Sequence, residues 1–149
     1  MSNTASSLQY ELLEEANFVK TLNTISRIIA FIIFIIEVPY ALFLFAITSH
    51  MLESSTSPPP FFFKGILFAI VLFMLASGIV NFIIFLGLGD VNNLIKRQEY
   101  KRARNATLIY MILGFVFSWI LVGALLLIAY MKYDTLIRLH ESISKQSSV

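Results

Sequence analysis

Apolar residues are concentrated in three long blocks along the 149-residue chain, and polar segments separate these blocks. The first block covers residues 28–47 and is interrupted only by Glu37 and Pro39, whereas residues 65–89 and 106–130 contain no charged side chain. About 20 apolar residues, at 1.5 Å each in a helix, cross the hydrocarbon core of a bilayer. Because a backbone in lipid must satisfy its own hydrogen bonds, the blocks predict three transmembrane helices.

The segment ahead of the first block has a helical periodicity of its own. Over residues 7–27, apolar side chains such as Leu12, Ala16 and Val19 recur every three or four positions, and acidic residues including Glu11 flank them. This pattern predicts an N-terminal amphipathic helix that lies on the membrane or against a partner protein. The predicted fold is therefore an all-α integral membrane protein with a single membrane domain.

Composition supports this fold class and excludes several others. Hydrophobic residues make up 58% of the chain and charged residues 13%, whereas soluble domains carry about 25% charge. The chain has no cysteine, which excludes a disulfide scaffold and a thiolate metal site. It has no catalytic or phosphate-binding motif, and its net charge of +2 forms no basic stripe. We therefore expect no enzymatic activity, no cofactor and no nucleic-acid partner.

The distribution of Lys and Arg predicts an orientation. The connection at residues 48–64, which contains Pro58-Pro59-Pro60 and can form a stiff turn, holds only Lys64. The positive-inside rule places the more basic connection at residues 90–105 in the cytoplasm. Three spans then place the N-terminus inside and the polar tail, residues 131–149, outside. The basic connection, which is expected to be helical, is either a lipid or partner contact or a solvated loop. Its five basic residues are Lys96, Arg97, Lys101, Arg102 and Arg104.

Glu37 is the residue that most deserves a chemical explanation. It lies halfway along the first block, where an acidic side chain costs about 2.5–3.5 kcal/mol on insertion scales. Pro39 lacks a backbone N–H and should kink the helix beside it. Polar residues occupy similar depths in the other two blocks, so we predict one intramembrane polar cluster. Its members are Glu37, Ser77, Asn81, Ser118 and Trp119.

Two interpretations of Glu37 stay open at this point. It is either a proton- or cation-binding carboxyl in a pathway, or a protonated residue that hydrogen-bonds across helices and fixes their assembly. The second is favoured because no other acidic or basic residue lies in the spans. The small residues Gly78, Gly114 and Ser118 are expected to allow close helix packing.

The expected function is that of a structural or accessory subunit in a larger membrane assembly, either a respiratory-type complex or a virion envelope. The cysteine-free, Ile-, Leu- and Phe-rich composition resembles that of membrane proteins from hot, acidic habitats and their enveloped viruses. The expected partners are the lipid bilayer and other membrane subunits or copies of the chain. The first alternative is a homo-oligomeric proton or cation pathway through Glu37. A weaker alternative is a haem or metal site formed by His50 and His140.

Overall fold

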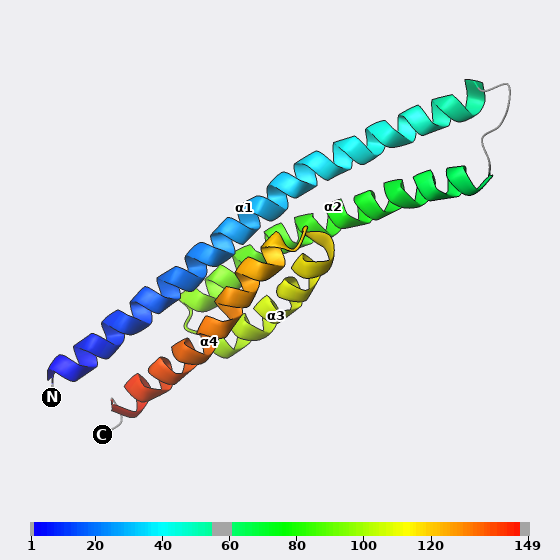
Figure 1. Ribbon diagram of the computed structural model, residues 1–149. Coiled ribbons are helices and arrows are strands. Elements are labelled where there is room, and N and C mark those ends of the chain that lie inside the picture. The colour runs from blue at the N-terminus through cyan, green and yellow to red at the C-terminus, as the bar shows by residue number, and fades with distance from the viewer. Residues whose placement is uncertain (1, 55–60, 147–149) are drawn as a thin grey trace.

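Four α-helices make up the part of the chain that the computed structural model describes, residues 2–54 and 61–146 (Figure 1). They are α1 (Ser2–Ser54), α2 (Phe61–Lys96), α3 (Tyr100–Phe117) and α4 (Leu121–Gln146). Each helix packs against its neighbours in sequence, and α4 also packs against α1. The helices therefore form an up-down-up-down bundle, with the start of α1 and the end of α4 at the same end of the molecule.

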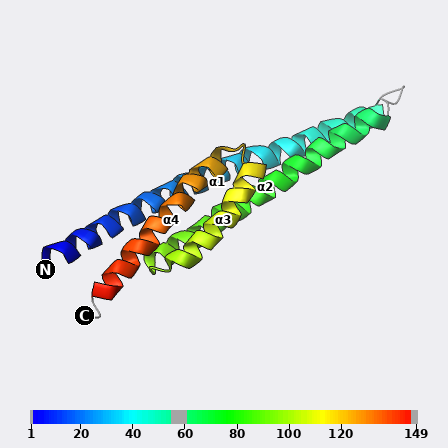
Figure 2. The ribbon, with the colours of Figure 1, turned by 60° about the horizontal axis from the view of Figure 1, so that its bottom comes forward.

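The four helices do not run the full length of the bundle. α1 and α2 have 53 and 36 residues, whereas α3 and α4 have 18 and 26. The α3–α4 hairpin covers α1 as far as Glu37 and the second half of α2, and beyond its tip α1 and α2 continue as a pair (Figure 2). The molecule thus has a four-helix part at the terminus end and a two-helix extension at the other end.

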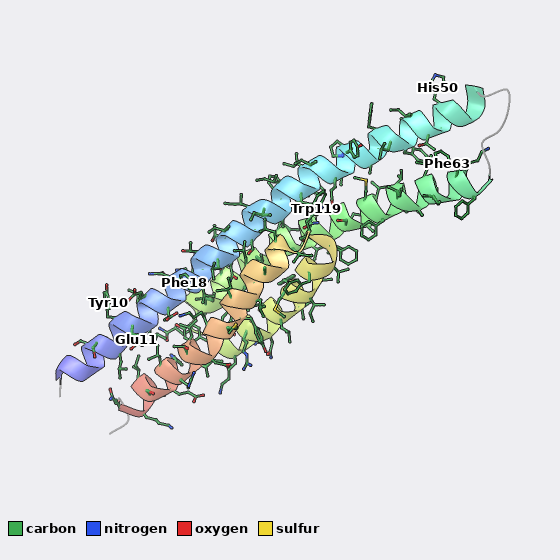
Figure 3. The ribbon with its side chains drawn as sticks, in the orientation of Figure 1. Tyr10, Glu11, Phe18, His50, Phe63 and Trp119 are labelled. Atoms are coloured by element: carbon green, nitrogen blue, oxygen red, sulfur yellow. The ribbon has the colours of Figure 1, made fainter. Side chains whose placement is uncertain are left out.

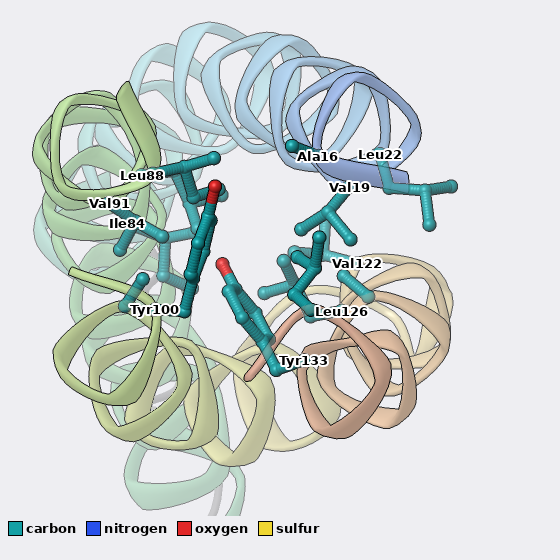
Figure 4. Close-up of a cluster of buried hydrophobic side chains, with 14 of the residues drawn as sticks. Ala16, Val19, Leu22, Ile84, Leu88, Val91, Tyr100, Val122, Leu126 and Tyr133 are labelled. Atoms are coloured by element: carbon teal, nitrogen blue, oxygen red, sulfur yellow. The ribbon is translucent and has the colours of Figure 1, made fainter. Parts of the chain in front are cut away.

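The apolar core lies in the four-helix part (Figure 4). Val19 of α1, Leu88 of α2 and Leu126 of α4 are fully buried there. Tyr100 at the start of α3 and Tyr133 of α4 place their rings in the same core. The close van der Waals packing of these side chains fixes α3 and α4 against the long helices.

The predicted division between an amphipathic helix at residues 7–27 and a first span at residues 28–47 is not seen, because α1 is one continuous helix. No Gly or Pro occurs in α1 before Pro39, so nothing in the backbone ends the helix at that point. One buried face runs through both parts, from Ala16 past Ala30 to Glu37. Pro39 itself lies inside α1 and does not end it.

The prediction of one continuous helix over residues 106–130 is wrong. The chain turns at residues 118–120, between α3 and α4, and the two helices run antiparallel. Trp119 and Ile120 have φ angles of 54° and 68°, in the left-handed region that a β-branched residue rarely adopts. Neither Gly nor Pro marks this turn in the sequence, which is why the apolar pattern predicts an uninterrupted span.

The connections also differ from their predicted extents. α2 continues through residue 90 to Lys96, so the basic connection reduces to three residues between α2 and α3. α4 continues to Gln146, so most of the segment predicted as a polar tail is helical. Pro58-Pro59-Pro60 lies outside the described residues.

Two of the described helices, α1 and α2, are long and apolar enough to cross a membrane. Only 17% and 22% of their most apolar windows are buried within the molecule, far less than expected for core helices of a soluble protein. Large side chains such as Ile36, Phe43 and Phe73 are exposed on them. These helices are compatible with a membrane protein, because an apolar surface of this extent needs an apolar environment.

Candidate functional site

The tip of the α3–α4 hairpin meets α1 and α2 in a group of polar side chains, which we call the tip cluster. It consists of Glu37 from α1, Ser77 and Asn81 from α2, and Ser118 and Trp119 from the turn. The structure thus brings together all five residues of the predicted intramembrane cluster. They meet because the chain turns at Ser118, and not because three spans cross at the same depth.

Glu37 links all three elements of the cluster. Its Oε2 lies 2.7 Å from Ser77 Oγ on α2, and its Oε1 accepts a 3.0 Å hydrogen bond from Trp119 Nε1 in the turn. The carboxyl group is buried, whereas the Trp119 side chain is 78% exposed and touches the bundle through its N–H. Figure 3 places Trp119 where the hairpin ends against the long helices. Glu37 therefore holds the tip of the hairpin against α1 and α2.

Side chains of α2 satisfy the backbone at the end of α3. The Phe117 carbonyl lies 2.8 Å from Ser77 Oγ and 3.0 Å from Asn81 Nδ2, and both can donate to it. Ser118 Oγ in turn donates to Asn81 Oδ1. The last carbonyls of a helix have no partner within the helix, and lipid offers none. The cluster thus supplies the partners that a helix end needs in an apolar environment.

The number of available hydrogen atoms determines how the hydrogen bonds of the tip cluster can be completed. Ser77 has one hydroxyl hydrogen but lies within bonding distance of both Glu37 Oε2 and the Phe117 carbonyl. When Glu37 is neutral, its O–H donates to Ser77 Oγ, and the Ser77 hydrogen is then available to Phe117. When Glu37 is ionised, Ser77 donates to Glu37, and Asn81 is then the side chain that donates to the Phe117 carbonyl. Every donor and acceptor of the network has a partner in both states.

Glycines set the distances between helices around the cluster. A Cβ atom on Gly78 would lie 2.6 Å from Val38 Cγ2, so the absence of a side chain lets α2 approach α1 next to Glu37. A Cβ atom on Gly114 would lie 2.8 Å from the backbone nitrogen of Gly123. Gly78 and Gly114 thus occupy the close-packing positions expected of them. Gly123, which sequence reasoning missed, is the partner of Gly114 across the hairpin.

The five basic residues of the α2–α3 region do not form one patch. Lys101 pairs with Glu141 at 2.9 Å, and Arg104 pairs with Asp134 at 3.0 Å, which joins the ends of α3 and α4. The Lys101 ammonium lowers the pKa of the exposed Glu141 carboxyl.

Arg102 also has an acidic partner, Glu99, at 2.7 Å. Neither Lys96 nor Arg97 has an ion-pair partner among the described residues. The acidic partners belong to the tertiary structure, so the basic pattern alone did not indicate them.

A second polar group, also missed by sequence reasoning, lies within the four-helix part. Asn23 of α1 donates to Asn92 of α2 at 3.2 Å, and Thr107 of α3 donates to Tyr133 of α4 at 3.1 Å. Burial raises the pKa of Tyr133, and its bond with Thr107 opposes that shift only in part. The first pair connects α1 to α2 and the second connects α3 to α4, both within the four-helix part of the bundle.

The two histidines are not placed to share a ligand. His50 lies at the far end of α1 (Figure 3), whereas His140 packs edge-on against Tyr100, 5.5 Å away, beside the first turns of α1. The expected haem or metal site needs both histidines together, and this arrangement does not bring the two of one chain together. No group of three or more metal-binding side chains occurs within residues 2–54 and 61–146.

Comparison with protein families, curated proteins and solved structures finds no match to this chain.

Proposed function

We propose that this protein is an integral membrane subunit in which α1 and α2 span the bilayer and the α3–α4 hairpin enters it from the terminus side. The apolar surface of α1 covers residues 28–47, about 30 Å of helix, which matches the hydrocarbon core. Residues 106–117 of α3 are about 18 Å long, so the hairpin tip reaches the middle of the bilayer. Glu37, halfway along the α1 span, meets the tip at this depth.

The distribution of charge supports this topology. Ten of the eleven Lys and Arg residues lie on the terminus side of the tip cluster, and only Lys64 lies near the other end. The positive-inside rule then places both termini in the cytoplasm. The C-terminus is thereby proposed on the side opposite to the one that three spans require.

The observation that carries a structural role is the closed hydrogen-bond network of the tip cluster. Both oxygens of Glu37 have protein partners, and those partners hold the end of α3. Such a network fixes one arrangement of helices in lipid. We infer that Glu37 is an assembly residue and that the protein is a structural or accessory subunit of a larger membrane assembly.

A partner is proposed because the bundle changes thickness within the membrane. Four helices fill the terminus-side half of the span, and two fill the other half. At the hairpin tip, where four helices give way to two, Trp119 is 78% exposed and Ile120 is 64% exposed. A transmembrane helix of another subunit, or of a second copy, can pack above the hairpin tip and cover this corner.

The alternative of a proton or cation pathway through Glu37 has less support. The nearest buried polar residue before it on the same face of α1 is Ser26, about 16 Å away along the helix axis. The fully buried α1 residue between them is Ala30. A path from the terminus side would need polar groups or water in this apolar interval. Flux in proteoliposomes that Glu37→Gln abolishes would favour the pathway over the structural role.

The proposed role is tested by extracting the protein from its own membranes with the surrounding lipid and measuring the mass of the intact particle. We expect at least one further protein chain at a fixed ratio. Ile120→Ala should weaken this association, whereas Ile112→Ala, a matched change on the outer face of α3 at 54% exposure, should leave it intact. Particles that contain a single copy of the chain and no other protein would contradict the proposal.

A further inference from the structure

An open pocket of about 740 Å³ lies between α1 and α2, on the terminus side of their apolar spans. Its basic residues are Lys20 and Arg27 from α1 and Lys96 from α2. Asp90 is the acidic residue of the lining, so the pocket has an excess of positive charge. It is separate from the tip cluster and shares no residue with it.

The three basic side chains have no ion-pair partner among the described residues, in contrast to Lys101, Arg102 and Arg104 nearby. Lys20 has a single 3.3 Å contact with Asn17 Oδ1, which leaves ammonium hydrogens for a ligand. The four ion pairs among the described residues thus use other cations, and three cations without an ion-pair partner line this one pocket.

The Arg27 guanidinium has a fixed position in this pocket. It stacks over the Phe85 ring at 4.5 Å, and its Nε is buried without a hydrogen-bond partner. The guanidinium also lies against Gly89 of α2, where a Cβ atom would be in ordinary van der Waals contact with Arg27 Cζ at 3.4 Å. A fixed, planar guanidinium recognises phosphate oxygens in a bidentate manner.

The pocket changes character along the direction of the helices. Lys20 and Lys96 line its terminus side, while the exposed apolar side chains Ile25 and Leu86 line it where the spans begin. In the proposed topology, the two lysines lie at the depth of lipid headgroups, and Arg27, two residues beyond Ile25 on α1, lies at the boundary with the acyl chains.

We propose that this pocket binds the phosphate headgroup of an anionic membrane lipid. Arg27 and Lys20 contact the phosphate oxygens from α1, Lys96 contacts them from α2, and the acyl chains follow Ile25 and Leu86 into the bilayer. Bound lipid bridges α1 and α2 by neutralising cations of both helices. The phosphate chemistry stands on the pocket alone, and the lipid source rests on the proposed membrane topology.

The test uses the full-length protein in neutral detergent and measures retained phosphatidylglycerol and phosphatidylcholine by mass spectrometry of the intact complex. We expect phosphatidylglycerol to be retained preferentially. Each basic residue near a membrane surface contributes about fivefold in binding. Lys20→Gln/Arg27→Gln should therefore reduce retention of phosphatidylglycerol about 30-fold.

The charge-matched control is Lys101→Gln/Arg102→Gln, which removes two ion-paired cations outside the pocket and should retain the lipid. If Arg27→Gln disturbs folding, Lys96→Gln, on an exposed side chain, tests the pocket independently, with an expected loss of about fivefold. Equal retention of the two lipids, or an equal loss in the control, would overturn the proposal.

Inorganic phosphate separates the two possible sources of the ligand. A phosphate site occupied by lipid predicts two results. Millimolar phosphate displaces phosphatidylglycerol, and without added phosphate the wild-type protein retains phosphatidylglycerol in preference to phosphatidylcholine. Binding of inorganic phosphate without retention of phosphatidylglycerol would contradict the lipid source. These measurements do not depend on whether a partner subunit exists.

Discussion

Replacing Glu37 should release the hairpin tip, and the chain carries its own reporter of this event. Trp119 is the single tryptophan of the sequence, and its indole N–H donates to Glu37 Oε1 at 3.0 Å. Glu37→Leu keeps a side chain of similar size but removes the bonds to Trp119 and Ser77. Glu37→Gln is the matched control, because its amide oxygen can accept from Trp119 and its NH₂ group can donate to Ser77.

The size of the effect follows from these two bonds. Hydrogen bonds between helices in membranes contribute about 0.6 kcal/mol on average and up to about 1.7 kcal/mol. Loss of two bonds should therefore destabilise the docked hairpin by about 1–3 kcal/mol, which raises the ratio of undocked to docked molecules by about 5- to 150-fold. Glu37→Gln should change this ratio much less.

The assay is tryptophan fluorescence in vesicles that contain lipids brominated at different depths. For the wild type and Glu37→Gln, bromine near the middle of the bilayer should quench Trp119 most strongly. For Glu37→Leu, the depth of strongest quenching should move toward the interface, where tryptophan side chains prefer to lie. An unchanged quenching profile in Glu37→Leu would refute the reasoning that Glu37 holds the tip.

Three further predictions concern the hairpin and its core. Gly123→Ala should destabilise the protein by about 1–3 kcal/mol in thermal unfolding, because the new Cβ would lie 2.7 Å from the backbone nitrogen of Phe115. Gly65→Ala, which has no atom within 4 Å of the new Cβ, should have no such effect, and equal losses would contradict the contact. Ile120 has a left-handed backbone, which costs a residue other than glycine about 1–2 kcal/mol, and its side chain is mostly exposed. Ile120→Gly should therefore raise the melting temperature, and a lowered melting temperature would argue against strain at this position. Burial raises the pKa of Tyr133 above 10.0, so its contribution is present at neutral pH and is lost as the pH rises through that raised pKa. Tyr133→Phe should flatten the alkaline part of a stability–pH profile, and an unchanged slope would assign that loss to other groups.

The sequence indicates the residues of the tip cluster but not the fold that unites them. Glu37, Ser77 and Ser118 stand out because each is polar at the middle of an apolar block, and that contrast is visible in the sequence. The turn at Ser118 is not visible, because a backbone break in an apolar environment depends on partners from another helix, here Ser77 and Asn81. Hydropathy measures how apolar a segment is and contains no information about such partners.

One local signal of the hairpin is nevertheless present. Gly114 and Gly123 lie at equal distances in sequence on either side of the turn between Ser118 and Trp119, as two helices that touch through their backbones require. The continuity of α1 was not predicted, because composition served as the sign of a boundary. Its change from polar to apolar composition suggested two elements, although no residue before Pro39 can break the helix.

The location of the two ends of the chain tests the central claim most directly. Because the chain has no cysteine, single substitutions can be labelled in sealed vesicles with a membrane-impermeant thiol reagent without any background. Suitable positions are Gln9→Cys and Gln146→Cys near the two termini and Ser57→Cys in the connection between the long helices. The re-entrant hairpin predicts that Gln9→Cys and Gln146→Cys react from the same side and Ser57→Cys from the other. Labelling of Gln146→Cys from the side of Ser57→Cys would show three spans and contradict the account.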